Sequence, residues 1–450
     1  MSNIRIGLEI HVQLNTNSKV FCGCPTAVNE NPNTNVCPTC LGLPGAKPVL
    51  NSQALEKAIK AALALNCKIS PETFYSRKSY FYPDLAKNFQ ITQYEIPIGT
   101  NGKLENIKIK RVHLEEDPGA LIHKGSITLI DYNRSGIPLI EIVTEPDFKS
   151  PNEVRLFLRK LITILEYLDI YERKSEAAMK ADANISTTGE KVEIKNITGL
   201  KEIERALEYE ALRQEKEPSK VQETRGWDSE KGITILQRIK ESEADYGYIF
   251  DGDLTKIEIN ETLLKKIQKD IPELSLDKVS RFKKQYKLPQ EDAETLASEK
   301  LLAEIFEKVA EKIDPILAAR WLRRDLVKVL NYNKQSIKDI TLDANHVIEL
   351  LTLLKENKIN DATAKELLIK LIQKPFSPKE YVKEENLEMT SSSDELESIC
   401  KEVIKNNLSV VDSYKSGKQE AMNFLVGQVM RLSKGKAHPK ETQKILKELI

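Results

Sequence analysis

Strict alternation of apolar and polar residues is the dominant pattern in the first half of the chain. In residues 4–14, apolar side chains alternate with polar ones that include Glu9 and His11. Successive side chains of a β-strand point to opposite faces, so this pattern predicts a strand with one apolar face and one titratable face. The same alternation recurs in residues 111–115, 179–185 and 192–196, and a fifth run, 139–143, is apolar except for Glu141.

The polar positions of these predicted strands carry charged or hydrogen-bonding groups. They are Glu9, His11, Arg111, His113, Glu115, Lys180, Asp182, Asn184, Glu193 and Lys195. One such strand alone is typical of an exposed sheet edge with cross-strand ion pairs. Because the pattern recurs so often in one region, we expect a sheet whose charged face forms a cradle for a polar substrate.

The pattern changes to helical periodicity beyond residue 260. Helices are predicted at 53–65, 151–169 and 202–216 in the first region, and at 301–313, 315–331, 344–356 and 361–373 in the second. A chain of 450 residues is too long for one core. We therefore predict an α+β protein with an antiparallel-sheet cradle domain (1–260), a helical domain (261–374) and a small helical tail (375–450).

Composition limits the classes of partner. Lys plus Arg and Asp plus Glu both number 68, so net charge gives no sign of a nucleic-acid partner and any RNA site must be a local basic patch. Basic side chains do cluster at 320–328 and at 431–444, which suits a phosphate backbone or an ordinary solvated face. No apolar run approaches a membrane span, and the polar start predicts no signal peptide, so a cytoplasmic protein is expected.

Four of the six cysteines form two close pairs, Cys22 with Cys24 and Cys37 with Cys40. In a reducing compartment this spacing favours one tetrahedral zinc over disulfides. Four cysteine ligands leave no open position for a substrate, so the predicted zinc site, in a loop at 20–42, is structural and argues against a zinc hydrolase. The alternative is four ordinary buried thiols.

Carboxylates are concentrated between residues 115 and 141. Glu115, Glu116 and Asp117 are consecutive, and Glu141 interrupts an apolar run where an unpaired charge is costly. A solvated acidic turn with an edge-strand glutamate is one interpretation. A divalent cation with oxygen ligands is the other.

Several motifs together resemble one known family. They are Gly7-Leu-Glu-Ile-His11, Tyr80-Phe-Tyr-Pro-Asp84, His113-Leu-Glu-Glu-Asp117, Asp131-Tyr-Asn-Arg134, Pro138-Leu-Ile-Glu141, Asp182-Ala-Asn-Ile-Ser186, Glu223-Thr-Arg225 and Phe424-Leu-Val-Gly427. In this order they resemble the B-type subunit of the tRNA-dependent amidotransferases, over essentially the whole chain. The inserted domain of the related archaeal E-type subunit has no counterpart here.

The resemblance implies a cradle that holds the 3′ end of a mischarged Glu-tRNA(Gln) or Asp-tRNA(Asn) and uses ATP and magnesium to phosphorylate the aminoacyl carboxylate. Ammonia from an amidase subunit then displaces the phosphate, and a small third subunit braces the amidase against this chain. It also implies that His11, Glu116 and Glu141 hold the magnesium ion with Glu9 beside them. The four cysteines match the zinc-bearing branch of the family, and the helical tail is implied to bind tRNA.

The remaining site residues are expected to contact substrate. Lys180, Lys195 and Arg225 are candidates for phosphate contacts, with Asp182 and Asn184 on the same face. Two segments depart from the family pattern, Ala177–Lys180 and Asp245–Asp253, and each lacks an arginine that the family usually has. These departures keep open the alternative of a zinc-stapled tRNA-binding or assembly protein without kinase activity.

Overall fold

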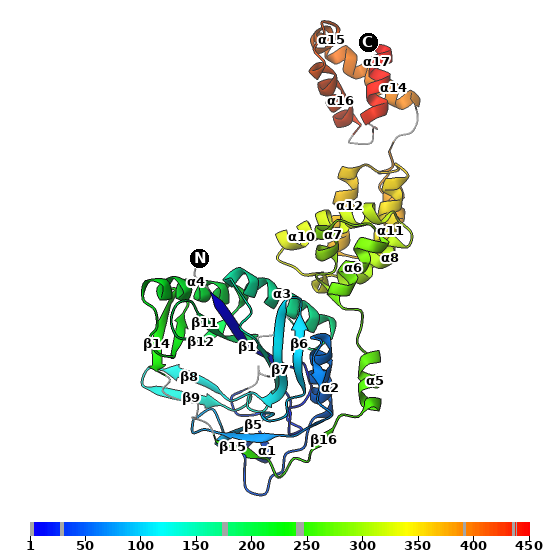
Figure 1. Cartoon of the computed structure of the whole chain (residues 1–450). Coiled ribbons are helices and arrows are strands. Elements are labelled where there is room, and N and C mark those ends of the chain that lie inside the picture. The colour runs from blue at the N-terminus through cyan, green and yellow to red at the C-terminus, as the bar shows by residue number, and fades with distance from the viewer. Residues whose placement is uncertain are drawn as a thin grey trace. The chain divides into compact units, whose positions relative to one another are not determined.

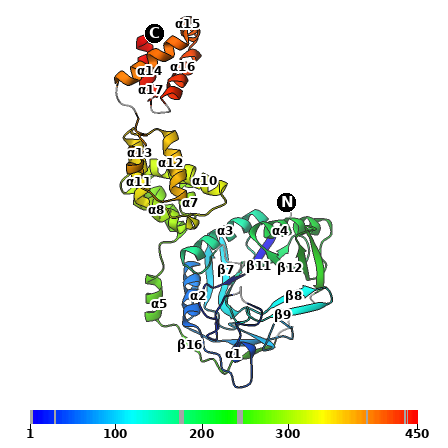
Figure 2. The same ribbon diagram turned by 180° about the vertical axis from the view of Figure 1, so that it is seen from behind.

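The computed structural model describes residues 4–27, 31–172, 179–239, 247–389, 393–433, 437 and 439–450. Contacts divide the chain into two compact units, Met1–Leu274 and Ser275–Ile450. The first unit contains all the strands of the described chain, and the second is helical (Figures 1 and 2). The predicted α+β class is therefore confirmed. No helix in the described part of the chain is long and apolar enough to cross a lipid bilayer.

Twelve strands of the described chain form the main sheet of the first unit. They are β1 (Arg5–Gln13), β2 (Lys68–Ile69), β4 (Ser76–Ser79), β5 (Phe89–Thr92), β6 (Gly99–Leu104), β7 (Ile107–Glu116), β10 (Pro138–Thr144), β11 (Lys180–Ser186), β12 (Val192–Thr198), β13 (Glu223–Asp228), β14 (Ile233–Ile239) and β15 (Gly247–Phe250). Two small separate sheets pair β3 (Glu72–Thr73) with β16 (Ile257–Glu258) and β8 (Ala120–Lys124) with β9 (Ile127–Asp131).

The main sheet follows the order β14-β13-β12-β11-β1-β10-β7-β5-β4-β15, and β6 also pairs with β7. All of its described pairings are antiparallel except β12 with β13, which run parallel. These two strands are joined by the helix α4 (Leu200–Lys216), because a parallel pair needs a long crossover connection. The predicted antiparallel sheet is thus mixed at this one pair.

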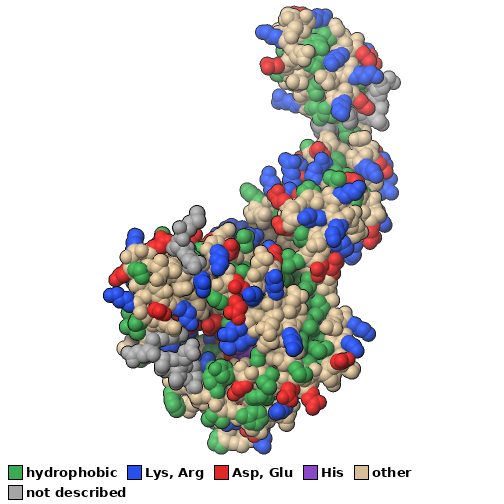
Figure 3. Space-filling model, viewed as in Figure 1, with side chains coloured by type: hydrophobic (Ala, Val, Ile, Leu, Met, Phe, Trp, Pro, Cys, Tyr) green, Lys and Arg blue, Asp and Glu red, His purple; other side chains and the backbone are tan. Residues whose placement is uncertain are grey.

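The apolar face of the sheet packs against helices. In β1, Leu8, Ile10 and Val12 are at most 1% exposed. The helices that cover this side include α2 (Ser52–Ala64), α3 (Pro151–Tyr167) and α4, and α3 packs against α4 (Figure 1). Asn51 and Ser150 cap α2 and α3 by accepting hydrogen bonds from backbone N–H groups of the first turn. The opposite face is left for the polar side chains, and Figure 3 shows a hollow in this unit where acidic, basic and histidine side chains are visible.

Helix α5 (Glu261–Lys269) belongs to the first unit, because it packs on α2. Contacts therefore divide the chain after Leu274, whereas the sequence placed the boundary at residue 260. A short helix in the loop of the cysteines, α1 (Pro38–Leu41), completes the unit.

The second unit contains two separate hydrophobic clusters. One runs from Phe282 to Val382 and the other from Leu396 to Leu446. The helices are α6 (Ser275–Gln285), α7 (Gln290–Leu296), α8 (Lys300–Ala310), α9 (Pro315–Arg320), α10 (Val327–Tyr332), α11 (Ala344–Lys355), α12 (Asp361–Gln373), α13 (Pro378–Glu384), α14 (Ser393–Asn406), α15 (Leu408–Lys415), α16 (Glu420–Leu432) and α17 (Pro439–Leu449), with a 3-10 turn at Ile337–Asp339. The helix predicted at 315–331 is interrupted by a π-helical turn, Trp321–Leu326, between α9 and α10.

Candidate active site and metal centres

The centre of the polar face is a cluster of His11, Glu115 and Glu141. His11 on β1 is the register partner of Glu141 on β10, which in turn faces His113 on β7. One potential ligand atom from each of His11, Glu115 and Glu141 lies within 4.8 Å of the others. The side chain of His11 is 26% exposed, whereas those of Glu115 and Glu141 are 6% and 11% exposed. Two carboxylates and an imidazole at this spacing form a set that can hold a divalent cation.

The structure places Glu115 in this cluster, where the expected ligand set has Glu116. The side chain of Glu116 lies on the other face of β7, where its carboxylate is 2.6 Å from Lys87 Nζ and accepts a hydrogen bond from the backbone N–H of Ile91. Consecutive strand residues point to opposite faces, so only one of these two glutamates can reach His11. Glu115 shares its face with His113, as the alternation in the sequence indicated.

His113 and Arg111 supply positive charge to the cluster. His113 Nε2 lies 2.8 Å from Glu141 Oε2 and 3.5 Å from Glu115 Oε2, and Arg111 lies 3.9 Å from Glu141. Burial disfavours a charged His113, but the two carboxylates outweigh burial and raise the pKa of His113 to about 9. Burial likewise opposes ionisation of Glu115 and Glu141, but His113 outweighs it and lowers the pKa of both. A positive imidazole therefore balances these acids when no cation is bound.

The next strands of the same face carry a second polar group. Lys195 on β12 lies 2.9 Å from both Asp182 on β11 and Glu193 on β12, and these contacts raise its pKa despite burial. Asn184 donates a hydrogen bond to Glu9 at 3.1 Å. Burial, together with the charge of Glu141, raises the pKa of Glu9. The predicted residues of β1, β11 and β12 thus lie on one surface.

At the end of β7, Asp117 joins the polar face to a nearby turn. Its carboxylate accepts a hydrogen bond from Gln13 and lies 3.2 Å from Nε of Arg134. Burial raises the pKa of Asp117, whereas burial and the nearby Arg134 lower the pKa of Lys180. Lys180 and Arg134 therefore bring two positive charges to the edge of the cluster.

Arg225 is held by its own protein neighbours. It donates hydrogen bonds to Glu223 and to the side chain and backbone oxygens of Thr234, at 2.9–3.0 Å, and lies 3.6 Å from the fully buried Glu210. Arg213 also binds Glu210. A guanidinium with these partners is a structural element of β13 and β14, and it has fewer donors left for a phosphate than expected.

The two segments that depart from the family pattern are described in part. Residues 177, 178, 245 and 246 lie outside the described residues. At the end of the second segment, Asp251 and Asp253 bind Arg77, which lies over the ring of Phe89. This group connects β4 to the chain that follows β15.

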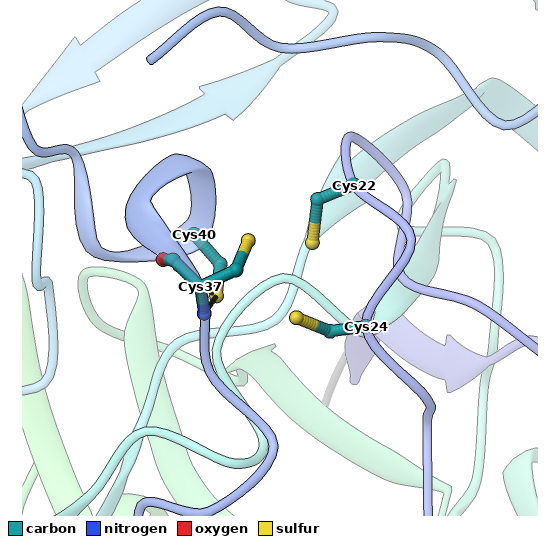
Figure 4. A group of neighbouring side chains, drawn as sticks. All are labelled: Cys22, Cys24, Cys37 and Cys40. Carbon is teal, nitrogen blue, oxygen red and sulfur yellow. Dashed lines mark hydrogen bonds between the residues drawn. The ribbon is translucent and has the colours of Figure 1, made fainter. Parts of the chain in front are cut away.

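The four cysteines converge as their spacing predicted. Cys22 and Cys24 lie on one loop and Cys37 and Cys40 at the start of α1, with all four sulfur atoms within 4.8 Å of one another (Figure 4). A hydrogen bond from Cys22 lowers the pKa of Cys40 to about 4 against the effect of burial, and Lys19 adds to the effect. The cluster can hold a metal ion, and four thiolate ligands suit zinc.

Some basic side chains of the second unit form ion pairs within the protein. Arg323 binds Glu291 and Asp292 on α7. Residues 434, 436 and 438 of the later cluster lie outside the described residues. The two interpretations of these clusters, a solvated face and a phosphate-binding face, therefore both stay predictions.

Sequence reasoning missed three members of the site, namely His113 as a partner of Glu141, Gln13 as a partner of Asp117, and Arg134. Strand alternation placed His113 and Gln13 on the correct face, but no residue spacing indicates that they bind acids on neighbouring strands. The contact between Arg134 and Asp117 depends on a turn that folds back across seventeen residues, so no local pattern predicts it.

Comparison with known sequences identifies relatives of the whole chain. A family described as "GatB/GatE catalytic domain" matches residues 4–265, and one described as "GatB domain" matches residues 304–450. The chain is 45% identical to the aspartyl/glutamyl-tRNA(Asn/Gln) amidotransferase B-type subunit of Methanothermobacter thermautotrophicus, covering 99% of this chain and all of the relative. The proteins of that name from Thermodesulfovibrio yellowstonii and Caldanaerobacter subterraneus are each 43% identical to it, covering 98% of this chain and 99% and 98% of the relatives.

Proposed function

Because this chain belongs to the family of aspartyl/glutamyl-tRNA(Asn/Gln) amidotransferase B-type subunits, we propose that it is one component of a glutamine-dependent ligase that forms a carbon–nitrogen bond. The proposed reaction converts mischarged Glu-tRNA(Gln), Asp-tRNA(Asn) or both to Gln-tRNA(Gln) and Asn-tRNA(Asn). The side-chain carboxylate of the aminoacyl group is first phosphorylated by ATP. Ammonia then displaces the phosphate, which leaves more readily than oxide or hydroxide would.

The observation that carries this proposal is the convergence of His11, Glu115 and Glu141 on one polar sheet face. Phosphoryl transfer depends on positioning and on neutralising charge at the transferred group, and it needs no side-chain nucleophile. A cluster of acids that can hold a cation, bordered by Lys180 and Arg134, meets that requirement. We propose that these residues bind and orient the phosphates and the aminoacyl carboxylate.

We propose Mg²⁺ as the ion at this cluster, with His11, Glu115 and Glu141 as its protein ligands and Glu9 nearby. When bound, Mg²⁺ would neutralise charge on the phosphates. Other residues of the chain hold the carboxylates of the site in place. His113 holds the carboxylate of Glu141, Asn184 holds that of Glu9, and Lys195 keeps Asp182 and Glu193 in place.

We propose zinc as the ion at Cys22, Cys24, Cys37 and Cys40. Four sulfur ligands would fill the tetrahedral coordination sphere of zinc, so this ion would bind no substrate. Its site and the polar face would then have different roles, the first structural and the second catalytic.

The proposed partners follow from the proposed reaction. An amidase subunit would release ammonia from glutamine, a small third subunit would brace the amidase against this chain, and the helical second unit would contact tRNA. A complex that acts on aminoacyl-tRNA is proposed to work in the cytoplasm.

The test is ATP hydrolysis by the reconstituted three-subunit complex, with and without mischarged tRNA and Mg²⁺. The proposal predicts hydrolysis that requires both, and its loss in Glu115→Gln and Glu141→Gln variants that keep their zinc. A complex that binds the tRNA but hydrolyses no ATP would instead support a binding or assembly protein without kinase activity.

A further inference from the structure

Lys19 is a lysine with no exposed surface, next to the cysteine cluster. Its ammonium lies 3.7 Å from the sulfur of Cys40, and it donates hydrogen bonds to the backbone oxygens of Asn35 at 2.8 Å and Tyr132 at 3.3 Å. Lysine is almost never fully buried without a negative partner. Among the residues that the structure describes, no carboxylate lies within ion-pair distance of it. The sulfur of Cys40 is an ionisable group that it does contact, and it belongs to the cysteine cluster.

A metal ion at the four cysteines would make that charge substantial. Four thiolates on one divalent ion carry a net charge of about −2, which is costly to bury. A buried ammonium in contact with one thiolate compensates part of this charge. Hydrogen bonds to ligand atoms also help to fix the ligands of a metal in place.

The contact of Lys19 with Tyr132 connects the cysteine loop to the turn Asp131–Gly136, more than ninety residues further along the chain. Further contacts reinforce this connection. Asn33 donates to Asp131 and to the backbone of Ile130 and accepts from Tyr132, while Asn35 and Asn133 are joined by a 2.7 Å hydrogen bond. The backbone N–H of Val20 also donates to the carbonyl of Gly136 at 2.8 Å.

Gly136 lies against the stem of Lys19. Its φ is +88°, a left-handed conformation that glycine adopts without strain, and a Cβ there would lie 3.4 Å from Cδ of Lys19, an ordinary contact distance. The apolar stem of Lys19 therefore supports the turn while its ammonium bonds the turn and the cysteine loop. The described loop residues 19–27 and 31–40 are therefore joined to the turn by packing and by hydrogen bonds.

The turn carries Arg134 to the polar face. Nε of Arg134 lies 3.2 Å from Asp117 and donates to the carbonyl of Pro118 at 3.1 Å. Among the described residues, the hydrogen bond of its guanidinium comes from Nε, and the side chain is 26% exposed, so the terminal nitrogens keep their donors for an anion. Asp117 also binds Gln13, which is two residues from His11 on the same strand face.

We propose that the metal-binding cysteine loop, through Lys19 and the Asn33 and Asn133 contacts, positions Arg134 at the polar face. Lys19 is the positioning residue and Arg134 the anion-binding residue that it serves. The anion is a phosphate or a carboxylate of the substrate, so this inference rests on the function proposed above. The cysteine site would then affect substrate binding, through the position of Arg134, in addition to its structural role.

The test compares Lys19→Met, which keeps the stem and removes the charge, with Lys160→Met, which removes an exposed charge from α3 in the same unit. Competition with a zinc chelator should show a metal affinity about 10–100-fold lower for Lys19→Met and unchanged for Lys160→Met, as is typical when a partner of a metal ligand is removed. An unchanged affinity in Lys19→Met would refute the role of Lys19 as charge partner.

Hydrogen–deuterium exchange tests the positioning without any assay of activity. In the full chain, removal of zinc and the Lys19→Met substitution should each speed exchange in residues 131–137, with β1 and β10 unchanged. If exchange in 131–137 stays the same while the metal is lost, the cysteine loop does not hold the turn. This result is readable even if the chain has no ATP-dependent activity, so it separates failure of the inference from failure of the proposed function.

A double-substitution experiment in the reconstituted complex tests the role of Arg134. Lys19→Met should raise KM for the mischarged tRNA or for ATP more than it changes kcat, and the same substitution should have little further effect in an Arg134→Gln background. If Lys19→Met instead raises KM by the same factor with and without Arg134→Gln, Lys19 does not act through Arg134.

Discussion

Glu115 and Glu116 are consecutive in the chain, yet their carboxylates lie on opposite faces of β7. Glu115 lies 3.7 Å from His11 on the polar face, and Glu116 lies 2.6 Å from Lys87 on the other side. One of the two acids is therefore available to a cation and a substrate. The other is a buried half of an ion pair that connects β7 to the segment before β5.

The ion pair of Glu116 and Lys87 gives a prediction for stability. The two side chains are 5% and 9% exposed, and removal of one member of a buried pair leaves the other charge without compensation. We expect Glu116→Gln and Lys87→Met each to lower the free energy of unfolding by about 3–5 kcal/mol. Urea unfolding of the full chain measures this.

Glu115→Gln is the matched control for that experiment. It should lower stability less than Glu116→Gln, because the 3.5 Å contact of Glu115 with His113 is partly offset by repulsion from Glu141 when no cation is bound. Equal losses of stability in the two variants would contradict the assignment of the acids to different faces.

Stability should depend on the protonation of His113. Its pKa is raised from the ordinary 6.5 to about 9, because its contacts with Glu141 and Glu115 outweigh burial. A raised pKa means that the stabilisation is complete below pH 6.5 and is lost as the pH rises through 9, and its size is on the order of 3 kcal/mol.

The measurement is unfolding of the wild type and His113→Gln in buffer without added divalent cations, at pH 6 and at pH 9.5. The destabilisation caused by the substitution should be larger at pH 6. A loss that is independent of pH would show that the imidazole is neutral in the folded protein.

Arg225 and Lys180 should respond differently to substitution. Arg225→Met removes a positive charge 3.6 Å from the fully buried Glu210, so we expect a loss of stability of about 2–4 kcal/mol and little change in KM for ATP. Lys180→Met should change KM and leave the unfolding midpoint within about 2 °C of the wild type. Thermal unfolding and ATP hydrolysis by the complex distinguish the two, and a selective rise in KM for Arg225→Met would restore it as a phosphate-binding residue.

Metal content should depend on four of the six cysteines. Cys22→Ser and Cys40→Ser should abolish stoichiometric zinc, because each removes one of four ligands. Cys67→Ser should retain it, since Cys67 is buried by Gly99 and Gly102 instead. Elemental analysis of the purified chain measures zinc, and zinc retained by Cys22→Ser would contradict the four-ligand site.

Much of the polar face could be predicted from the sequence, because strand alternation is a local signal. The alternation in residues 4–14 fixed which side chains share the face of His11, and the strand β1 follows it. The same signal placed Glu115 on the strand face of His113, whereas the family resemblance implied Glu116 as a ligand of the ion. In the structure the side chain of Glu115 is the one that lies near His11.

Contacts between distant segments could not be predicted. Lys19 is one charged residue in a loop, and nothing local distinguishes it from an exposed lysine. Its burial depends on a turn at residues 131–136. Likewise, the ion pair of Arg225 depends on Glu210 of α4. The packing of α4 against β14 depends on the whole fold, so no local pattern indicates it. The parallel pairing of β12 with β13 depends on that same helix.

The most direct test of the proposed cation site is a titration of the full, zinc-loaded chain with Mn²⁺, a substitute for Mg²⁺ that electron paramagnetic resonance detects. We expect one bound Mn²⁺ per chain at the polar face, lost in Glu115→Gln and in Glu141→Gln and kept in Glu116→Gln. Loss of Mn²⁺ in Glu116→Gln with retention in Glu115→Gln would contradict the proposed cation site.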